Sequence, residues 1–224
     1  MAKQGFVWSY STIDAWRRCP RMFFETTISK RYKRDFVKTP AIERGEKIHG
    51  MINRHIELGD ALPPALRRVT DIVRKLSTGA RVIQTERKLA VTRDWRPTGF
   101  FDHDVWGRAV ADATFVYETG AVYVDWKTGS WKQDGLQLRL TALVLFPHLS
   151  EAVERIRAFY WYTTDDEPSE VEIVTRDDFA KARTDGVPEI LRIEDAIRKG
   201  DFPPKPGFQC RWCPVKSCPH NGKE

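Results

Sequence analysis

The chain has 224 residues, of which 41% are hydrophobic and 12% aromatic, a composition typical of an ordered globular protein that excludes a disordered chain. The start of the chain lacks the apolar core of a signal peptide, and no apolar run approaches the roughly 18 residues of a membrane span. We therefore expect a single domain, residues 1–224, in the cytoplasm and without a membrane partner.

The charge of the chain favours a polyanionic partner. The net charge is +6 and the pI is near 9.2, and basic side chains that neutralise phosphates release condensed counterions. The densest basic run is the candidate DNA-binding patch, which consists of Lys30, Arg31, Tyr32, Lys33 and Arg34. Basic runs also lie on solvated surfaces that bind no nucleic acid, so charge alone leaves both interpretations open.

Helical signals dominate the first third of the chain. Ser11, with Asp14 three residues later, predicts the start of a short helix that Pro20 interrupts. Pro40 suits the first turn of a helix that runs to about Leu58. A further helix follows, and its apolar stripe consists of Leu66, Val69, Ile72, Val73 and Leu76.

From about residue 81 the pattern of apolar residues indicates strands. The predicted strands are 82–91, 100–106, 110–117, 122–127, 156–162 and 171–174. A helix over 135–146 precedes the fifth strand, and helical stretches after the sixth strand end at Gly200. Thr175 and Asp178 indicate a capping box there. This order predicts an α/β fold in which helices flank a mixed central sheet.

Two neighbouring strands carry acidic residues at a spacing that suits a metal site. A turn at residues 119–120 would pair Asp112 with Lys127, and Asp125 would share their face of the sheet. Two carboxylates within diagonal reach repel each other unless a cation lies between them, and Mg²⁺ prefers such oxygen ligands. A cross-strand ion pair between Asp112 and Lys127 explains the same residues without a metal.

Several motifs together resemble one known family. Residues 123–129, with the sequence YVDWKTG, resemble the hydrophobic-Asp-aromatic-Lys-Thr-Gly motif of RecB-like nuclease domains, which belong to the PD-(D/E)XK superfamily. Gly107 and Asp112 resemble the upstream strand of that family, which contains glycine and ends in a metal-binding aspartate. Gly45 and His49 resemble its Gly-x-x-x-His helix motif. The resemblance covers nearly the whole chain and implies a restriction-endonuclease-like fold.

The resemblance also implies roles for individual residues. It implies that Mg²⁺ or Mn²⁺ is held by His49, Asp112, Asp125 and the Trp126 carbonyl, that Lys127 is catalytic, and that Gln137 lies near the lysine or the DNA. The family motif Gln-x-x-x-Tyr is matched in part, because Thr141 stands where the tyrosine is expected. From its residue type alone, His49 would be a packed or surface histidine. Glu86 lies where some relatives carry a further acid, but we expect it to be a surface charge.

The cysteines indicate one metal centre. Cys19 lies near the N-terminus, whereas Cys210, Cys213 and Cys218 form a C-x2-C-x4-C segment near the other end. Closely spaced thiols in a cytoplasmic protein favour a metal over disulfides. Zinc and iron–sulfur clusters both accept four thiolates, and a local zinc site could use His220 in place of Cys19.

The family resemblance favours the iron–sulfur interpretation. AddB-like nucleases and CRISPR adaptation nucleases hold a four-iron four-sulfur cluster with one cysteine before the nuclease core and three after it, which is the distribution in this chain. The resemblance therefore implies a 4Fe-4S cluster, with zinc as the alternative. The cluster would join residues 9–25 to residues 205–220, around a nuclease core at about 40–200.

By resemblance, the chain is expected to be a metal-dependent deoxyribonuclease. The expected activity is that of an exonuclease that hydrolyses phosphodiester bonds at DNA ends or in single strands, with a metal-activated water. Such domains act in recombination, DNA repair, phage replication and CRISPR systems, so a helicase or another protein of those pathways is an expected partner. Two alternatives remain: a catalytically idle subunit that binds DNA ends or serves as a scaffold, and a zinc-binding adaptor.

Overall fold

A computed structural model describes residues 6–33, 38–129 and 134–223. The chain divides into two compact units. The sheet unit comprises residues 38–184, and the terminal unit combines residues 1–37 with residues 185–224. Among the described residues, no helix has both the length and the apolar character needed to cross a membrane.

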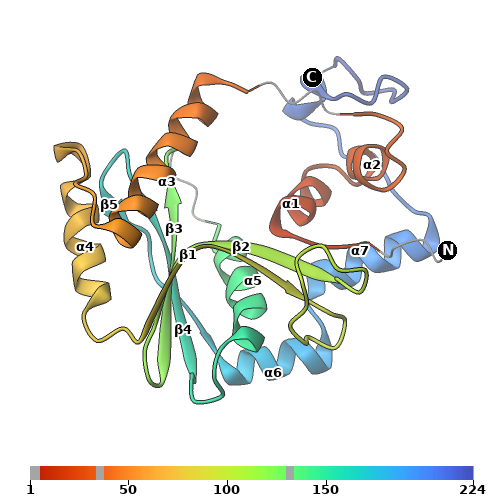
Figure 1. Ribbon diagram of the computed structural model, residues 1–224. Coiled ribbons are helices and arrows are strands. Elements are labelled where there is room, and N and C mark those ends of the chain that lie inside the picture. The colour runs from red at the N-terminus through yellow and green to blue at the C-terminus, as the bar shows by residue number, and fades with distance from the viewer. Residues whose placement is uncertain (1–5, 34–37, 130–133, 224) are drawn as a thin grey trace. The chain divides into compact units, whose positions relative to one another are not determined.

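The sheet unit is built on a mixed sheet (Figure 1). Its strands in the described residues are β1 (Val82–Val91), β2 (Gly107–Val116), β3 (Gly120–Lys127), β4 (Arg155–Tyr162), β5 (Glu167–Pro168) and β6 (Glu172–Thr175). The strand order is β1-β2-β3-β4-β5, and β6 pairs with β4. Only the β3–β4 pair among these is parallel. The predicted α/β class and the mixed central sheet are confirmed, and this architecture is consistent with a restriction-endonuclease-like fold.

Helices cover both faces of this sheet. The helices of the unit are α3 (Pro40–Leu58), α4 (Arg67–Ser77), α5 (Leu136–Leu145) and α6 (Arg176–Asp185), with 3-10 turns η2 (Pro64–Leu66) and η3 (Phe146–His148). Helices α3 and α4 pack their apolar stripes against Phe115, Val124 and Trp126. Side chains alternate between the faces of a strand, so the residues between these on β3 face α5 instead. Eight of the ten α5 residues are buried, as expected for a helix in the interior.

The terminal unit has a helical part and a tail. Its helices are α1 (Tyr10–Arg18), α2 (Pro20–Phe23), a π-helical turn η1 (Phe24–Ile28), α7 (Pro188–Lys199) and a 3-10 turn η4 (Phe208–Trp212). Aromatic rings hold the helical part together, because Trp16 contacts Phe23 and Phe202, and Phe24 stacks on Phe202 at 4.3 Å. The tail after Phe202 contains no long helix or strand among its described residues.

The predicted cap of the first helix is wrong. The N-cap is Ser9, whose extended backbone lets its side chain accept the N–H of Thr12, and the Thr12 hydroxyl accepts the Ser9 N–H in return. Asp14, which was expected to belong to the cap, instead forms an ion pair with Arg18 one turn later, at 2.6 Å. The predicted capping box of Thr175 and Asp178 is confirmed.

The predicted strand over residues 100–106 is also wrong. This segment belongs to a turn-rich loop, and β2 begins only at Gly107. The cause is local hydrogen bonding, because Asp102 accepts the N–H of Gly99 at 2.9 Å and Asp104 accepts the hydroxyl of Thr98 at 2.7 Å. Aspartate side chains that satisfy nearby donors in this way compete with a strand ladder.

Candidate functional site

The β2–β3 hairpin brings the two motif aspartates to one level of the sheet. The N–H of Tyr117 donates to the Gly120 carbonyl at 2.8 Å and closes a two-residue turn. When the observed register is extended along the strands, Asp112 is level with Asp125 rather than with Lys127. The pairing predicted from a turn at residues 119–120 is therefore wrong by two positions. Because strands alternate with a period of two, this error leaves the faces of the side chains unchanged.

Asp125 is the centre of a buried polar network. Its side chain is 4% exposed and receives hydrogen bonds from the Tyr123 hydroxyl at 2.9 Å and the Gln137 amide at 2.7 Å. The Lys127 ammonium lies 2.6 Å from its other carboxylate oxygen. Lys127 also donates to the Gln137 carbonyl oxygen at 2.9 Å and lies 4.9 Å from the centre of the Tyr160 ring. Charge-assisted bonds of this kind fix the positions of the carboxylate and the ammonium.

Asp112 lies beside this network with a strongly perturbed acidity. One of its oxygens accepts the backbone N–H of Trp126 at 2.9 Å. Burial, then the negative charge of Asp125 and more weakly that of Glu86, raise the pKa of Asp112 to about 8, while the Trp126 amide and Lys127 act in the opposite direction. Two carboxylates in such a place cannot both ionise at low cost unless positive charge is added. The site therefore has the electrostatics of a cation-binding site.

A second group of ligands faces Asp112 from α3 and β1. His49 Nδ1 lies 3.6 Å from Asp112 Oδ2 and 3.9 Å from Glu86 Oε1, and the side chain of Asn53 donates to the same Glu86 oxygen at 3.1 Å. One possible ligand atom from each of His49, Glu86 and Asp112 lies within 4.8 Å of the others. Imidazole and carboxylate groups at this spacing could hold a metal ion.

Glu86 is the residue that sequence reasoning undervalued. It was expected to be a surface charge, and its side chain is 48% exposed, yet it points to His49 and Asp112. Its backbone has a φ of 45°, a left-handed conformation that is strained for a residue other than glycine. The β1–β2 ladder continues on both sides of Glu86 without pairing it. The one signal in the sequence was that some relatives carry an acidic residue at the corresponding position.

Gly45 explains how α3 approaches the motif strand. A Cβ atom at this position would lie 3.1 Å from the Thr128 hydroxyl oxygen, which is tighter than an ordinary contact. Gly45 and His49 are four residues apart and share one side of the helix. The absence of a side chain at Gly45 thus lets α3 lie close to the end of β3, with His49 one turn further along.

The departure from the family motif at Thr141 has a structural counterpart. Thr141 is 3% exposed on α5, and its side chain lies near the hydroxyl of Tyr123 of β3. Burial, followed by the charges of Asp125 and Asp112, raises the pKa of Tyr123 well above its usual value, so its hydroxyl stays protonated as a donor. A phenol from the strand therefore reaches the Asp125 network where the helix supplies none.

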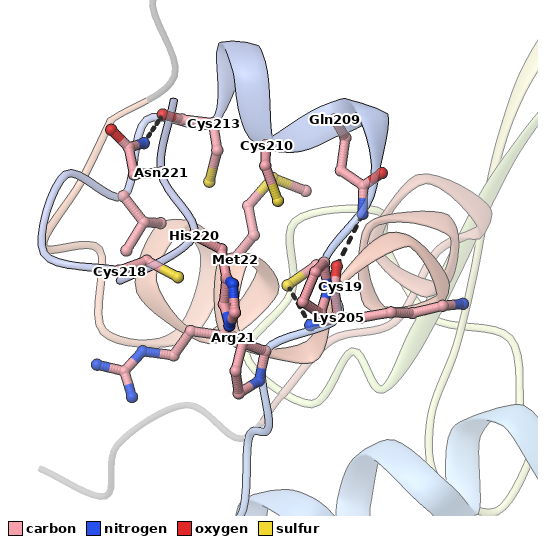
Figure 2. A pocket seen from close by; sticks show the side chains of 13 residues that line it. Cys19, Arg21, Met22, Lys205, Gln209, Cys210, Cys213, Cys218, His220 and Asn221 are labelled. Atoms are coloured by element: carbon pink, nitrogen blue, oxygen red, sulfur yellow. Dashed lines mark hydrogen bonds between the residues drawn. The ribbon is translucent and has the colours of Figure 1, made fainter. Parts of the chain in front are cut away.

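The cysteines gather in the terminal unit. Cys19, at the start of α2, and three cysteines of the tail line one pocket together with Met22 and His220, and Figure 2 shows their sulfur atoms directed toward a common space. The three tail cysteines are Cys210, Cys213 and Cys218. Burial, and then the charges of the other three thiols, raise the pKa of Cys213. The structure thus brings together the four thiols that the sequence predicted to form one site.

Two residues of the basic run after η1 make contacts inside the terminal unit. Arg31 lies 3.6 Å from Glu25, a carboxylate that is 1% exposed and also lies 3.2 Å from Arg21. Tyr32 packs against the cysteine cluster. Lys30 and Lys33 are exposed, and Arg34 lies outside the described residues. Contact with DNA by this patch remains a prediction.

The chain belongs to the PD-(D/E)XK nuclease superfamily, whose family description matches residues 7–219. Membership suggests a nuclease that uses Mg²⁺ or Mn²⁺ and acts on DNA. The solved structure titled "Crystal structure of SSO0001" is similar to this chain, with 17% sequence identity and a TM-score of 0.45, over 93% of this chain and 85% of that chain. No curated protein matches the chain.

Proposed function

We propose that this protein is a metal-dependent deoxyribonuclease, an exonuclease that hydrolyses phosphodiester bonds at DNA ends or in single strands with water as the nucleophile. The observation that carries the proposal is the buried network of Asp125, Lys127 and Gln137 beside Asp112. Buried charges are costly, and their retention at one end of a strand pair is expected where they serve chemistry.

The donor set fits a hard divalent cation. Asp112 and Asp125, with the Trp126 carbonyl, His49 and Glu86, offer the oxygen and imidazole ligands that would hold Mg²⁺ or Mn²⁺. When bound, such an ion lowers the pKa of a coordinated water and polarises a phosphoryl oxygen. The raised pKa of Asp112 supports this assignment, because added positive charge would reduce the repulsion between the carboxylates.

Lys127 is the residue proposed to act on the reacting atoms. Its ammonium is held by Asp125, by Gln137 and over the Tyr160 ring, and one third of its side chain is exposed. In this position it can orient the attacking water and donate to the phosphate oxygens on which negative charge develops. Gln137 is a positioning residue, because its amide group donates to Asp125 while its carbonyl accepts from Lys127.

The test is degradation of labelled linear DNA with Mg²⁺ or Mn²⁺. Asp125→Ala and Lys127→Ala should each lower the rate by about 100-fold or more, since both remove groups that act in the transition state. Asp177→Ala, which removes an exposed acid of α6, serves as the matched control and should leave the rate unchanged. Unchanged degradation in the two site variants would refute the assignment, and no degradation by the parent protein would favour the idle DNA-binding or scaffold subunit.

A covalently closed circle of the same sequence separates the two modes of cleavage. An exonuclease leaves the closed circle intact and degrades the linear form from its ends. Equal degradation of the circle and the linear form would contradict the exonuclease assignment but not hydrolysis itself.

We also propose that the four thiols hold a 4Fe-4S cluster. Cys19 from the start of the chain and three cysteines of the tail line one pocket, which supports a single centre with four thiolate ligands. The distribution of one cysteine before the core and three after it, as in the resembling nucleases, favours the iron–sulfur cluster over zinc. Anaerobically purified protein should be coloured and contain iron and sulfide, whereas a colourless protein with stoichiometric zinc would overturn this proposal.

A further inference from the structure

We propose that Phe100, Phe101, Lys88 and Arg108 form a stacking subsite for single-stranded DNA, which holds the strand a few nucleotides from the scissile phosphate. This inference deepens the proposed nuclease function and rests on it. The subsite, hereafter the ribbon platform, lies on the β1–β2 ribbon in the sheet unit, in and next to the loop that replaces the predicted strand at residues 100–106.

The ribbon platform combines an exposed ring with two cations. Phe101 is 77% exposed, although large apolar side chains are normally covered, and Phe100 packs edge-on against it at 5.1 Å. The Lys88 ammonium lies 5.8 Å from the Phe101 ring centre, and the Arg108 guanidinium lies 5.2 Å from that of Phe100. The Nε atom of Arg108 is buried and has no hydrogen-bond partner among the described residues. An aromatic face with adjacent cations fits a nucleobase and its phosphates.

The loop holds the rings in place by local hydrogen bonds. The Thr98 hydroxyl donates to Asp104 at 2.7 Å and lies 3.2 Å from Asp102, and the Gly99 N–H donates to Asp102. A side chain at Gly99 would clash with Asp102, because an added Cβ would lie 2.6 Å from its carboxylate oxygen. The acids of the loop are therefore engaged in fixing its backbone, while the lysine and the arginine come from the strands beside it.

The open side of the ribbon connects this platform to the candidate metal site. Lys88 pairs with Val110, and Ala90 with Arg108, on strands that also carry Glu86 and Asp112. Val110 is 38% exposed, and the residues at 108, 110 and 112 share one face of β2, so this face connects Arg108 to Asp112.

The span suits a short length of nucleic acid. Arg108 lies four residues before Asp112 on β2, which is about 14 Å along an antiparallel strand. If the scissile phosphate of a DNA strand lies at Asp112, a base a few nucleotides along that strand would reach Phe101. Stacking on an aromatic ring does not depend on base identity and requires an unpaired base, so the platform favours single strands over duplex.

The experiment measures binding of labelled 12-mer oligo-dT by anisotropy, without added metal, in the Asp125→Ala background. Phe101→Ala should weaken binding about 10-fold, and Phe101→Trp should restore it, because loss of one stacked base has an effect of this size. Phe208→Ala is the matched control, since Phe208 is 68% exposed and also lies beside an arginine, but in the terminal unit. Equal weakening by both alanine variants, or none by Phe101→Ala, would overturn the inference.

A second readout separates this inference from the proposed function. In the otherwise intact enzyme, Phe101→Ala should raise the KM for oligo-dT about 10-fold, while hydrolysis of a thymidine p-nitrophenyl phosphodiester, which reaches only the metal site, should be unchanged. If Phe101→Ala leaves the hydrolysis of oligo-dT unchanged, the ribbon-platform proposal is refuted and the nuclease proposal is not. If the protein hydrolyses neither substrate but Phe101→Ala still weakens binding, the nuclease proposal fails and the platform stands as a DNA-binding site.

Discussion

The sheet and the C-terminal tail acquire their order in different ways. The sheet buries large apolar side chains on one face and, on the other, a polar network centred on Asp125. The tail, residues 205–223, has short 3-10 and turn segments and buries only Cys210 and Val215 among its described residues. A segment with so little apolar burial needs another source of order, and the cluster proposed at its thiols would provide one. One region is thus stabilised by its core, and the order of the other is expected to depend on what its cysteines bind.

The largest expected effect comes from breaking the tail. Cys213→Ser should release residues 205–223 to proteolysis while the sheet stays folded, because binding of a structural metal contributes about 10 kcal/mol in small metal-dependent segments. Limited trypsin digestion with mass spectrometry identifies the cleaved sites, and circular dichroism follows the sheet.

His220→Ala is the control for that experiment, because His220 lines the same pocket. It should leave the tail protected if four thiols are the ligands. If His220→Ala releases the tail and Cys19→Ser does not, the centre is the local zinc site instead.

The next largest expected effect concerns the polar network around Asp125. Tyr123→Phe removes one hydroxyl and its bond to the Asp125 carboxylate. We expect the free energy of unfolding to fall by about 1.5–3 kcal/mol, as for a hydrogen bond to a charged group. Tyr117→Phe, whose hydroxyl donates to the neutral Leu76 carbonyl, is the control and should cost about 0.5–1.5 kcal/mol. Urea unfolding measures both, and equal losses would contradict a special role for the Asp125 network.

A smaller effect distinguishes two glycines of α3. Gly50 has open space around its missing side chain, so Gly50→Ala should stabilise the protein by about 0.5–1 kcal/mol through helix propensity. The stabilisation from Gly45→Ala should be about 1 kcal/mol smaller than that from Gly50→Ala, because the added methyl group would press on Thr128. Adding Thr128→Ala to Gly45→Ala should restore the gain in a double-mutant cycle. Equal stabilisation at both glycines would mean that α3 does not lie close to the motif strand.

The smallest effect concerns the cap of α6. Hydrogen bonds from the Thr175 backbone and side chain lower the pKa of Asp178 below its ordinary 3.8. A carboxylate with a lowered pKa stabilises the fold above its ordinary pKa, and this contribution is lost as pH falls through the folded value. Asp178→Ala should therefore lower stability by about 0.5–1 kcal/mol at pH 7. Denaturation at a series of pH values should show the difference from the parent shrinking below pH 3.8, and a constant difference would contradict the prediction.

The sequence predicted those features that have local signals. Helix α3 lies between Pro40 and Leu58 as predicted, because Pro40 suits the first turn and Gly59 ends the helix in a left-handed conformation. The motif residues Asp125, Lys127 and Gln137 also lie together, because their spacing places them at the end of β3 and the start of α5.

Other features depend on contacts that no local pattern reveals. The register of the β2–β3 hairpin was missed because neighbouring residue pairs could each form the turn, and tertiary packing selects one of them. The place of Glu86 was missed because its role depends on His49 of α3 and Asp112 of β2, which lie close to it only in the folded chain. Its left-handed φ is likewise held by the surrounding structure and has no local signal. The loop at residues 100–106 was mistaken for a strand because its aromatic residues are typical of strands, although Phe101 is exposed.

The bond between the Lys205 amide and the Cys19 sulfur joins residues that are 186 positions apart. A ribosome adds roughly 5–20 residues per second, so helices α1 and α2 emerge about 10–40 s before the tail that completes their cysteine site. During this interval Cys19 has no tail partners, so the four thiols can come together only after the tail has been synthesised. A chain whose synthesis stops before Cys210 would keep the residues of the sheet site but lack three of the four thiols.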